Sequence, residues 1–82
     1  MKNIRKHGID FQEAMTVFRD EFSLTFNDFT HSNDEERSID IGRSAKGKLL
    51  VVVYTERGNN IRIISCRKAT PAEKKIYETQ NT

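Results

Sequence analysis

Apolar side chains recur at helical spacing near both ends of the chain. Asp10 and Glu13 form a capping-box pattern, and apolar positions then follow at steps of three and four over residues 11–19. Thr70 is followed by a proline and, three positions on, by a glutamate, which is the pattern of a capped helix start. We therefore expect amphipathic helices over residues 11–19 and 71–79, the second with a narrow apolar face.

Between these helices, polar and apolar positions alternate with the period of a strand. The alternation covers residues 22–27 and 37–41, and a run that is apolar on both faces, 48–55, indicates a central strand. Residues 61–67 follow a glycine-containing turn and complete an antiparallel meander. The expected fold class is therefore α+β, a small antiparallel sheet of about four strands flanked by an N-terminal and a C-terminal helix.

The length of 82 residues predicts a single domain over 1–82 with a thin core, because a small domain buries only about 60% of the surface of its unfolded chain. The function is then expected on the surface or in a shallow groove. A lone cysteine, Cys66, and two widely spaced histidines cannot form a metal cluster without help from carboxylates, and a thin core has no room for a large cofactor, so no metal and no cofactor is expected. The longest apolar run, 49–54, is too short to cross a membrane, and the polar N-terminus is unlike a signal peptide, which predicts a cytoplasmic protein.

Charge is divided unevenly along the chain. Residues 1–40 hold five lysines and arginines against nine acidic residues, whereas residues 41–82 hold nine against three, so the halves carry −4 and +6. A basic half favours a polyanionic partner such as a nucleic acid, because neutralising phosphates releases counterions. The alternative is a solvated surface that only keeps the domain in solution. Charge alone leaves both open.

Six segments follow one another in a recognisable order. They are Lys6-His7-Gly8; Phe11-x-x-Ala14 with Val17-Phe18; His31-Ser32-x-x-x-Glu36-Arg37; Ile41-Gly42; Tyr54-Thr55-Glu56-Arg57; and Ile61-Arg62-Ile63-Ile64-Ser65-x-Arg67-Lys68-Ala69. Together they resemble the BrnT family of bacterial toxins over nearly the whole chain, which is more specific than any single motif. Family members usually carry a further segment before Lys-His-Gly, so the first strand and part of the opening helix are expected to be missing here.

The resemblance implies a RelE-like fold and a metal-independent ribonuclease toxin of a type II toxin–antitoxin system. It also implies neutralisation by a BrnA-like antitoxin with a ribbon-helix-helix domain, and binding of operator DNA only through the toxin–antitoxin complex. Two alternatives remain on the residues alone. One is a module that binds RNA without cutting it, and the other is a domain that only holds the antitoxin.

Cleaving RNA without a metal requires cations beside the reacting phosphate. The candidates in the last predicted hairpin and its exit are Arg57, Arg62, Arg67 and Lys68, and Lys6 is a further RNA-binding candidate in the family-like N-terminal segment. Because strand side chains alternate, Arg62 and Arg67 are expected on opposite faces unless a bulge intervenes. Arg67, at the strand end near the sheet edge, is then the favoured catalytic cation. The alternative is that these residues are solvated and keep the sheet soluble.

The reaction also needs a base for the 2′-hydroxyl and an acid for the leaving oxygen. Histidine titrates nearest neutral pH, so His7 and His31 are candidates, although His7 also fits a helix end and His31 an ordinary turn. Glu56 is a candidate base that an adjacent arginine can instead hold in an ion pair. Tyr54 offers a hydroxyl, but core packing is the favoured role for it. The sequence does not divide the acid from the base.

The phenylalanines can be read in two ways. Phe11, Phe18, Phe22 and Phe26 offer rings that can stack on bases, as exposed rings do in proteins that bind single strands. Their helical and strand spacing instead assigns them to the core, because a domain this small has few other large side chains. Cys66 is expected to be a small buried apolar residue.

Overall fold

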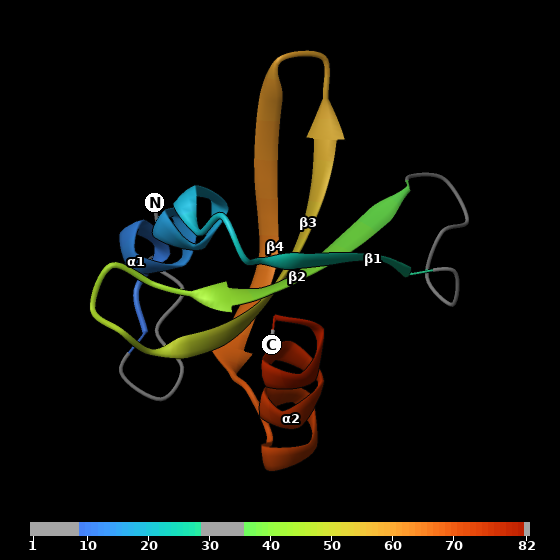
Figure 1. Ribbon diagram of the computed structural model, residues 1–82. Coiled ribbons are helices and arrows are strands. Elements are labelled where there is room, and N and C mark those ends of the chain that lie inside the picture. The colour runs from blue at the N-terminus through green and yellow to red at the C-terminus, as the bar shows by residue number, and fades with distance from the viewer. Residues whose placement is uncertain (1–8, 29–35, 82) are drawn as a thin grey trace.

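The computed structural model describes residues 9–28 and 36–81, and it has the predicted order of elements (Figure 1). Helix α1 spans Phe11–Thr16 and continues into a 3₁₀ turn, η1, at Val17–Arg19. The strands are β1 at Leu24–Asp28, β2 at Arg37–Arg43, β3 at Leu49–Arg57 and β4 at Asn60–Lys68, and helix α2 at Pro71–Gln80 ends the chain. All neighbouring strands are antiparallel, in the order β1-β2-β3-β4, which confirms the predicted α+β class.

Local polar contacts fix where both helices begin. The Asp10 carboxylate accepts a hydrogen bond of 2.7 Å from the Glu13 N–H, so Asp10 caps α1 as predicted. The Glu13 side chain is buried and accepts a hydrogen bond of 2.7 Å from the Ser44 hydroxyl, which ties α1 to the β2–β3 turn. At α2 the predicted capping box forms in full, because Thr70 and Glu73 each accept a hydrogen bond from the other's backbone N–H.

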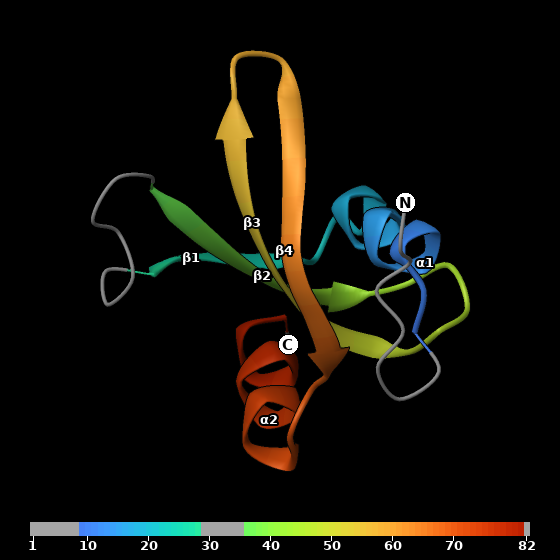
Figure 2. The same ribbon diagram turned by 180° about the vertical axis from the view of Figure 1, so that it is seen from behind.

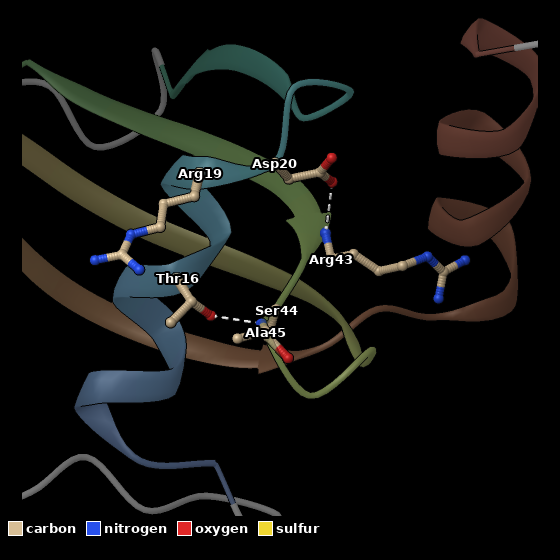
Figure 3. Close-up of a pocket in the computed structure, with 6 residues that line it drawn as sticks. All are labelled: Thr16, Arg19, Asp20, Arg43, Ser44 and Ala45. Atoms are coloured by element: carbon tan, nitrogen blue, oxygen red, sulfur yellow. Dashed lines mark hydrogen bonds between the residues drawn. The ribbon is translucent and has the colours of Figure 1, made fainter.

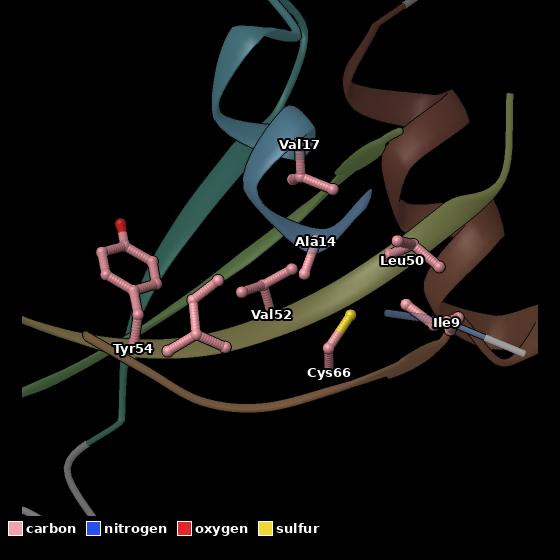
Figure 4. Close-up of a cluster of buried hydrophobic side chains, with 8 residues drawn as sticks. Ile9, Ala14, Val17, Leu50, Val52, Tyr54 and Cys66 are labelled. Atoms are coloured by element: carbon pink, nitrogen blue, oxygen red, sulfur yellow. The ribbon is translucent and has the colours of Figure 1, made fainter. Parts of the chain in front are cut away.

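The sheet separates the helices and buries apolar side chains on both of its faces. Alternate residues of β3 point in opposite directions: Leu50, Val52 and Tyr54 pack under α1, whereas Val51 packs under α2. We call these sides the α1 face and the α2 face. Figure 4 shows the larger core, on the α1 face, which comprises Ile9, Ala14, Val17, Leu50, Val52, Tyr54, Ile63 and Cys66. The smaller one, on the α2 face, contains Ile41, Val51 and Tyr77. The β3–β4 hairpin extends beyond both helices (Figure 2).

A β-bulge in β4 changes which side chains share a face. Val53 pairs with Ser65, but the next residue of β3, Tyr54, pairs with Ile63, so Ile64 is an extra residue. Cross-strand partners point to the same face. Arg62 is opposite Thr55 and Arg67 is opposite Val51, which places both arginines on the α2 face. The expectation that they lie on opposite faces is therefore wrong, because it held only for a strand without a bulge.

The phenylalanines are divided between core and surface. Phe11 and Phe18 pack against the larger core, and the Phe18 ring meets the Tyr54 ring edge to face at 4.8 Å. Phe22 and Phe26 are 60% and 44% exposed, so assigning them to the core was wrong. Phe22 lies in the turn before β1, and Phe26 lies on the edge strand opposite Ile39. Helix α2 is short and covers Leu24, two residues before Phe26 on the same face, so that Leu24 packs against the smaller core.

Three further predictions concern Tyr54, Cys66 and membrane-spanning segments. Tyr54 is a core residue, and its hydroxyl donates a hydrogen bond of 2.9 Å to the buried Asp40 carboxylate. Cys66 is buried, as predicted, and burial raises the pKa of its thiol to about 11, so it packs as an apolar group. In the described ranges, no helix is long and apolar enough to cross a membrane.

Candidate nucleic-acid interface

The α2 face continues along the sheet beyond the helix, where Phe26 is exposed and Ile39, Val53 and Ser65 are half-buried. Strand register orders it in rows, and the row under Tyr77 contains Leu24, Ile41, Val51 and Arg67. The next row, farther from α2, holds Phe26, Ile39, Val53 and Ser65. It combines an exposed aromatic ring with a hydroxyl. Such a surface offers stacking and hydrogen bonding to an unpaired nucleotide.

The row beyond it contains two arginines and one carboxylate, since Asp28 of β1 pairs with Arg37 of β2. Thr55 of β3 pairs with Arg62 of β4. On its other side, the β2–β3 ladder runs to Ser38 opposite Tyr54, so Arg37 is the β2 residue beside Thr55. We call Arg37, Thr55 and Arg62 the arginine row. Because neighbouring strands are about 4.8 Å apart, the two arginines start roughly 10 Å apart on either side of Thr55.

This spacing suits one phosphate group between two guanidinium groups. Arginine side chains are long enough to converge from strands this far apart, and each guanidinium can donate two hydrogen bonds to phosphate oxygens. Arg62 is exposed and Arg37 half-buried. Among the described residues, neither forms an ion pair with a carboxylate. Arg62 is therefore available to an anion, and Arg37 is available beside the carboxylate of its cross-strand neighbour Asp28.

Thr55 lies at the centre of the row and has an unusual hydroxyl. The residue is only 2% exposed, and its Oγ1 has no hydrogen-bond partner among residues 9–28 and 36–81. A buried hydroxyl without a partner costs on the order of 1–3 kcal/mol. The fold thus carries this free-energy cost at Thr55, the residue between Arg37 and Arg62.

Arg67, the favoured catalytic cation of the sequence, lies at the foot of α2. Its guanidinium donates two hydrogen bonds to the Glu73 carboxylate, at 2.7 and 2.8 Å. These bonds hold the pKa of Glu73 down at about 2 and raise that of Arg67. The carboxylate form therefore stabilises the fold at neutral pH, and this contribution is lost as pH falls from about 4.5 towards 2. Arg67 anchors α2, and its catalytic role stays a prediction.

The structure distributes the other predicted residues over different surfaces. Glu56 pairs with Ile61 and Lys68 pairs with Leu50, so both belong to the α1 face. Arg57 ends β3 at the hairpin turn. It lies on the α2 face, two residues after Thr55 and therefore one row beyond the arginine row. Lys6, His7 and His31 lie outside the described residues. Of the predicted site, the structure thus brings Arg62 into the arginine row and Arg57 next to it.

Sequence reasoning missed Arg37 and Thr55 as members of the site. Residue types alone give neither of them a role in the site. Both residues occur in segments that carry the BrnT resemblance. The resemblance therefore draws attention to both residues. Only the strand register establishes that they share a face with Arg62.

Two further arginines, Arg19 and Arg43, line a cavity beside α1 whose polar contacts hold the fold together. A small cavity of about 210 Å³ is lined by Thr16, Arg19, Asp20, Arg43, Ser44 and Ala45 (Figure 3). Its two guanidinium groups point away from each other. The Asp20 carboxylate accepts hydrogen bonds from the N–H groups of Phe22 and Arg43 and from the Tyr77 hydroxyl. Burial acts to raise the pKa of Asp20, but these bonds outweigh it and the pKa is lowered. Asp20 thus joins the segment after η1 to β2 and α2.

Two further features bear on acid–base and metal chemistry, the protonation of Tyr54 and the arrangement of metal-ligating side chains. Burial and the bond to Asp40 raise the pKa of Tyr54 to about 12, so its hydroxyl stays protonated at neutral pH. No group of three or more histidine, cysteine or acidic side chains in the described part of the chain has the arrangement of a metal site.

A four-stranded antiparallel sheet with a helix on each face and arginines on the α2 face defines a small α+β domain with a basic surface. The comparison with family models agrees. The model described as "Ribonuclease toxin, BrnT, of type II toxin-antitoxin system" matches residues 1–73, and the chain belongs to that family. Membership implies a ribonuclease toxin with an RNA substrate and an antitoxin partner. The search of curated proteins found no match.

Proposed function

We propose that this protein is a metal-independent endoribonuclease whose RNA substrate lies across the α2 face. The observation that carries the proposal is the arginine row, in which two guanidinium groups without an ion-pair partner in the described part of the chain lie on either side of Thr55. The 2′-oxygen attacks the adjacent phosphorus, a new P–O bond forms, and the bond to the 5′-oxygen breaks. The products are a 2′,3′-cyclic phosphate and a 5′-hydroxyl end. Arg37 and Arg62 stabilise the negative charge that gathers on phosphorus as the bonds exchange.

We assign the two proton transfers to the acid–base candidates that the sequence predicts. The base takes the proton of the 2′-hydroxyl, and the acid delivers one to the leaving 5′-oxygen. His7, His31 and Glu56 are the candidates. Glu56, on the α1 face, is the least suited to a substrate on the α2 face. The two histidines are therefore the first choice, since neutral imidazole accepts a proton and imidazolium donates one.

Cleavage in a chelator tests this function. The purified chain is expected to cut single-stranded RNA as fast in excess EDTA as without it, leaving 2′,3′-cyclic phosphate and 5′-hydroxyl ends. End-group analysis of a labelled oligonucleotide checks the products, and an Arg62→Ala preparation purified in parallel controls for contaminating nuclease. Loss of cleavage in EDTA, or 5′-phosphate ends, would show that the proposed mechanism is wrong. RNA that is bound but uncut would favour the non-catalytic RNA-binding module instead.

The partner proposal concerns how the toxin is held inactive. We propose a BrnA-like ribbon-helix-helix antitoxin that covers the arginine row and supplies all specific contacts to operator DNA. The toxin itself acts in the cytoplasm, where its RNA substrates are. In a mobility-shift assay at physiological salt, only the complex should bind operator DNA specifically, and excess antitoxin should release RNA from the toxin. Specific operator binding by the toxin alone, or a ternary complex with RNA, would contradict this arrangement. A chain that binds antitoxin but no RNA would be an antitoxin-binding module only.

A further inference from the structure

We propose that Thr55 is a phosphate-positioning residue, and that the arginine row is a site for one phosphodiester group of the RNA. The proposal rests on the proposed function, because it assigns a site on the same face. Three observations carry it: the buried Thr55 hydroxyl has no partner in the described part of the chain, Arg62 is its cross-strand neighbour, and Arg37 flanks it from β2. The hydroxyl can donate one hydrogen bond, each guanidinium group donates several, and the oxygens of one phosphate can accept from all three groups.

The composition of β3 argues that folding does not require this hydroxyl. The strand reads Leu-Leu-Val-Val-Val-Tyr-Thr, and valine fills three successive positions before Tyr54. Valine has nearly the shape of threonine, favours strands equally and carries no polar atom to leave unpaired. A buried Thr55 is therefore a less stable choice than valine at the same place. Buried polar groups without partners are rare in native proteins, and each one calls for a reason.

Within the described ranges, one other buried side-chain oxygen has no hydrogen bond, and neighbouring groups explain it, whereas no neighbouring acceptor explains the Thr55 hydroxyl. Glu13 leaves its Oε1 without a hydrogen bond, but Lys48 Nζ is 3.8 Å from that oxygen, and its Oε2 is bound to Ser44. Glu13 therefore has a cation and a donor beside it. Thr55 has two cationic neighbours, which cannot accept its proton. An anion placed between the arginines supplies the missing acceptor.

Access to the hydroxyl is coupled to binding of the phosphate. Thr55 is almost fully buried, and its nearest cross-strand side chains are the two flexible arginines. When their guanidinium groups grip a phosphate, the same rotation opens the space above Thr55. The hydroxyl then donates to a phosphate oxygen and fixes its position along the row. Its role is positioning, because the charge is stabilised by the arginines.

The test compares Thr55→Val with Thr55→Ser. Thr55→Val is expected to raise the unfolding midpoint of the chain, because it removes an unpaired buried hydroxyl, and yet to lower kcat for RNA cleavage about 10- to 100-fold, as loss of a hydrogen bond to a charged group does. Thr55→Ser keeps the hydroxyl and should retain kcat to within a few-fold. Thr25→Val, the same change at an exposed position of β1 on the α1 face, should leave cleavage unchanged.

The outcomes separate this proposal from the proposed function. A Thr55→Val chain that is more stable and fully active would overturn the positioning role. One that loses stability along with activity would show a structural role, and this also overturns the proposal. A second assay measures binding of a 2′-deoxy oligonucleotide, which cannot be cleaved. If the wild-type chain binds it but cuts no RNA, the ribonuclease proposal fails. The site then survives only if Thr55→Val weakens this binding and Thr25→Val does not.

Discussion

Replacing Arg62 with alanine is expected to lower kcat for RNA cleavage by about 10²- to 10³-fold, the usual cost of removing one preorganised donor to a developing charge. Arg62 is exposed and has no ion-pair partner among the described residues, so its removal leaves no buried charge behind. The unfolding midpoint should therefore stay within experimental error of wild type. Cleavage of a labelled oligonucleotide and urea denaturation check the two halves of this prediction.

Matched variants make the result specific to the arginine row. Lys75→Ala removes an exposed cation from α2 and should leave cleavage nearly unchanged. Arg67→Ala removes the partner of Glu73 and should lower stability more than kcat. If Arg67→Ala abolishes cleavage in a folded chain while Arg62→Ala does not, the reacting phosphate lies at the foot of α2. The sequence prediction for Arg67 would then replace the arginine row as the catalytic centre.

The elements of this fold could be predicted because their signals are local. Asp10 and Thr70 mark both helix starts through contacts three residues away, and the alternating pattern fixes the strands. The faces of β4 could not be predicted, because Ile61, Ile63 and Ile64 make the strand apolar on both sides of the bulge. A one-residue insertion in such a run leaves no mark in the pattern, yet it moves every later side chain to the other face.

The site was harder to predict because its properties depend on partners. Glu73 was recognised as a capping residue, but its bidentate contact with Arg67 requires the strand exit and the helix start to meet in space. Thr55 has no chemical signal in the sequence. Its significance comes from burial and from a missing hydrogen bond, both of which depend on tertiary structure. Residue types therefore indicated what chemistry is available, and the strand register showed which of these residues lie together on one face.

Gly42→Ala is expected to destabilise the fold by about 2–3 kcal/mol, near the upper end for overpacking of a core. Gly42 belongs to a family-like segment, and the reason for glycine there is close approach. An added Cβ would lie 2.9 Å from both Ser23 Cβ and Val17 Cγ1 and 3.3 Å from an Asp20 carboxylate oxygen. Real Cβ atoms do not tolerate 2.9 Å, so η1 and the turn after it must move away from β2. Urea denaturation followed by circular dichroism measures the loss.

Two further variants distinguish crowding from a general effect of losing glycine. Gly58→Ala places a Cβ in open space at a residue with φ of +57° and should cost only about 1 kcal/mol, from backbone strain. Val17→Ala removes one of the two close contacts, so it should cost less in a Gly42→Ala background than alone. Additive losses would mean that the two side chains do not compete for space. Because Asp20 joins this turn to α2, crowding at Gly42 should also weaken the packing of Tyr77. The α2 face depends on that packing, and RNA cleavage should then fall as the fold loosens.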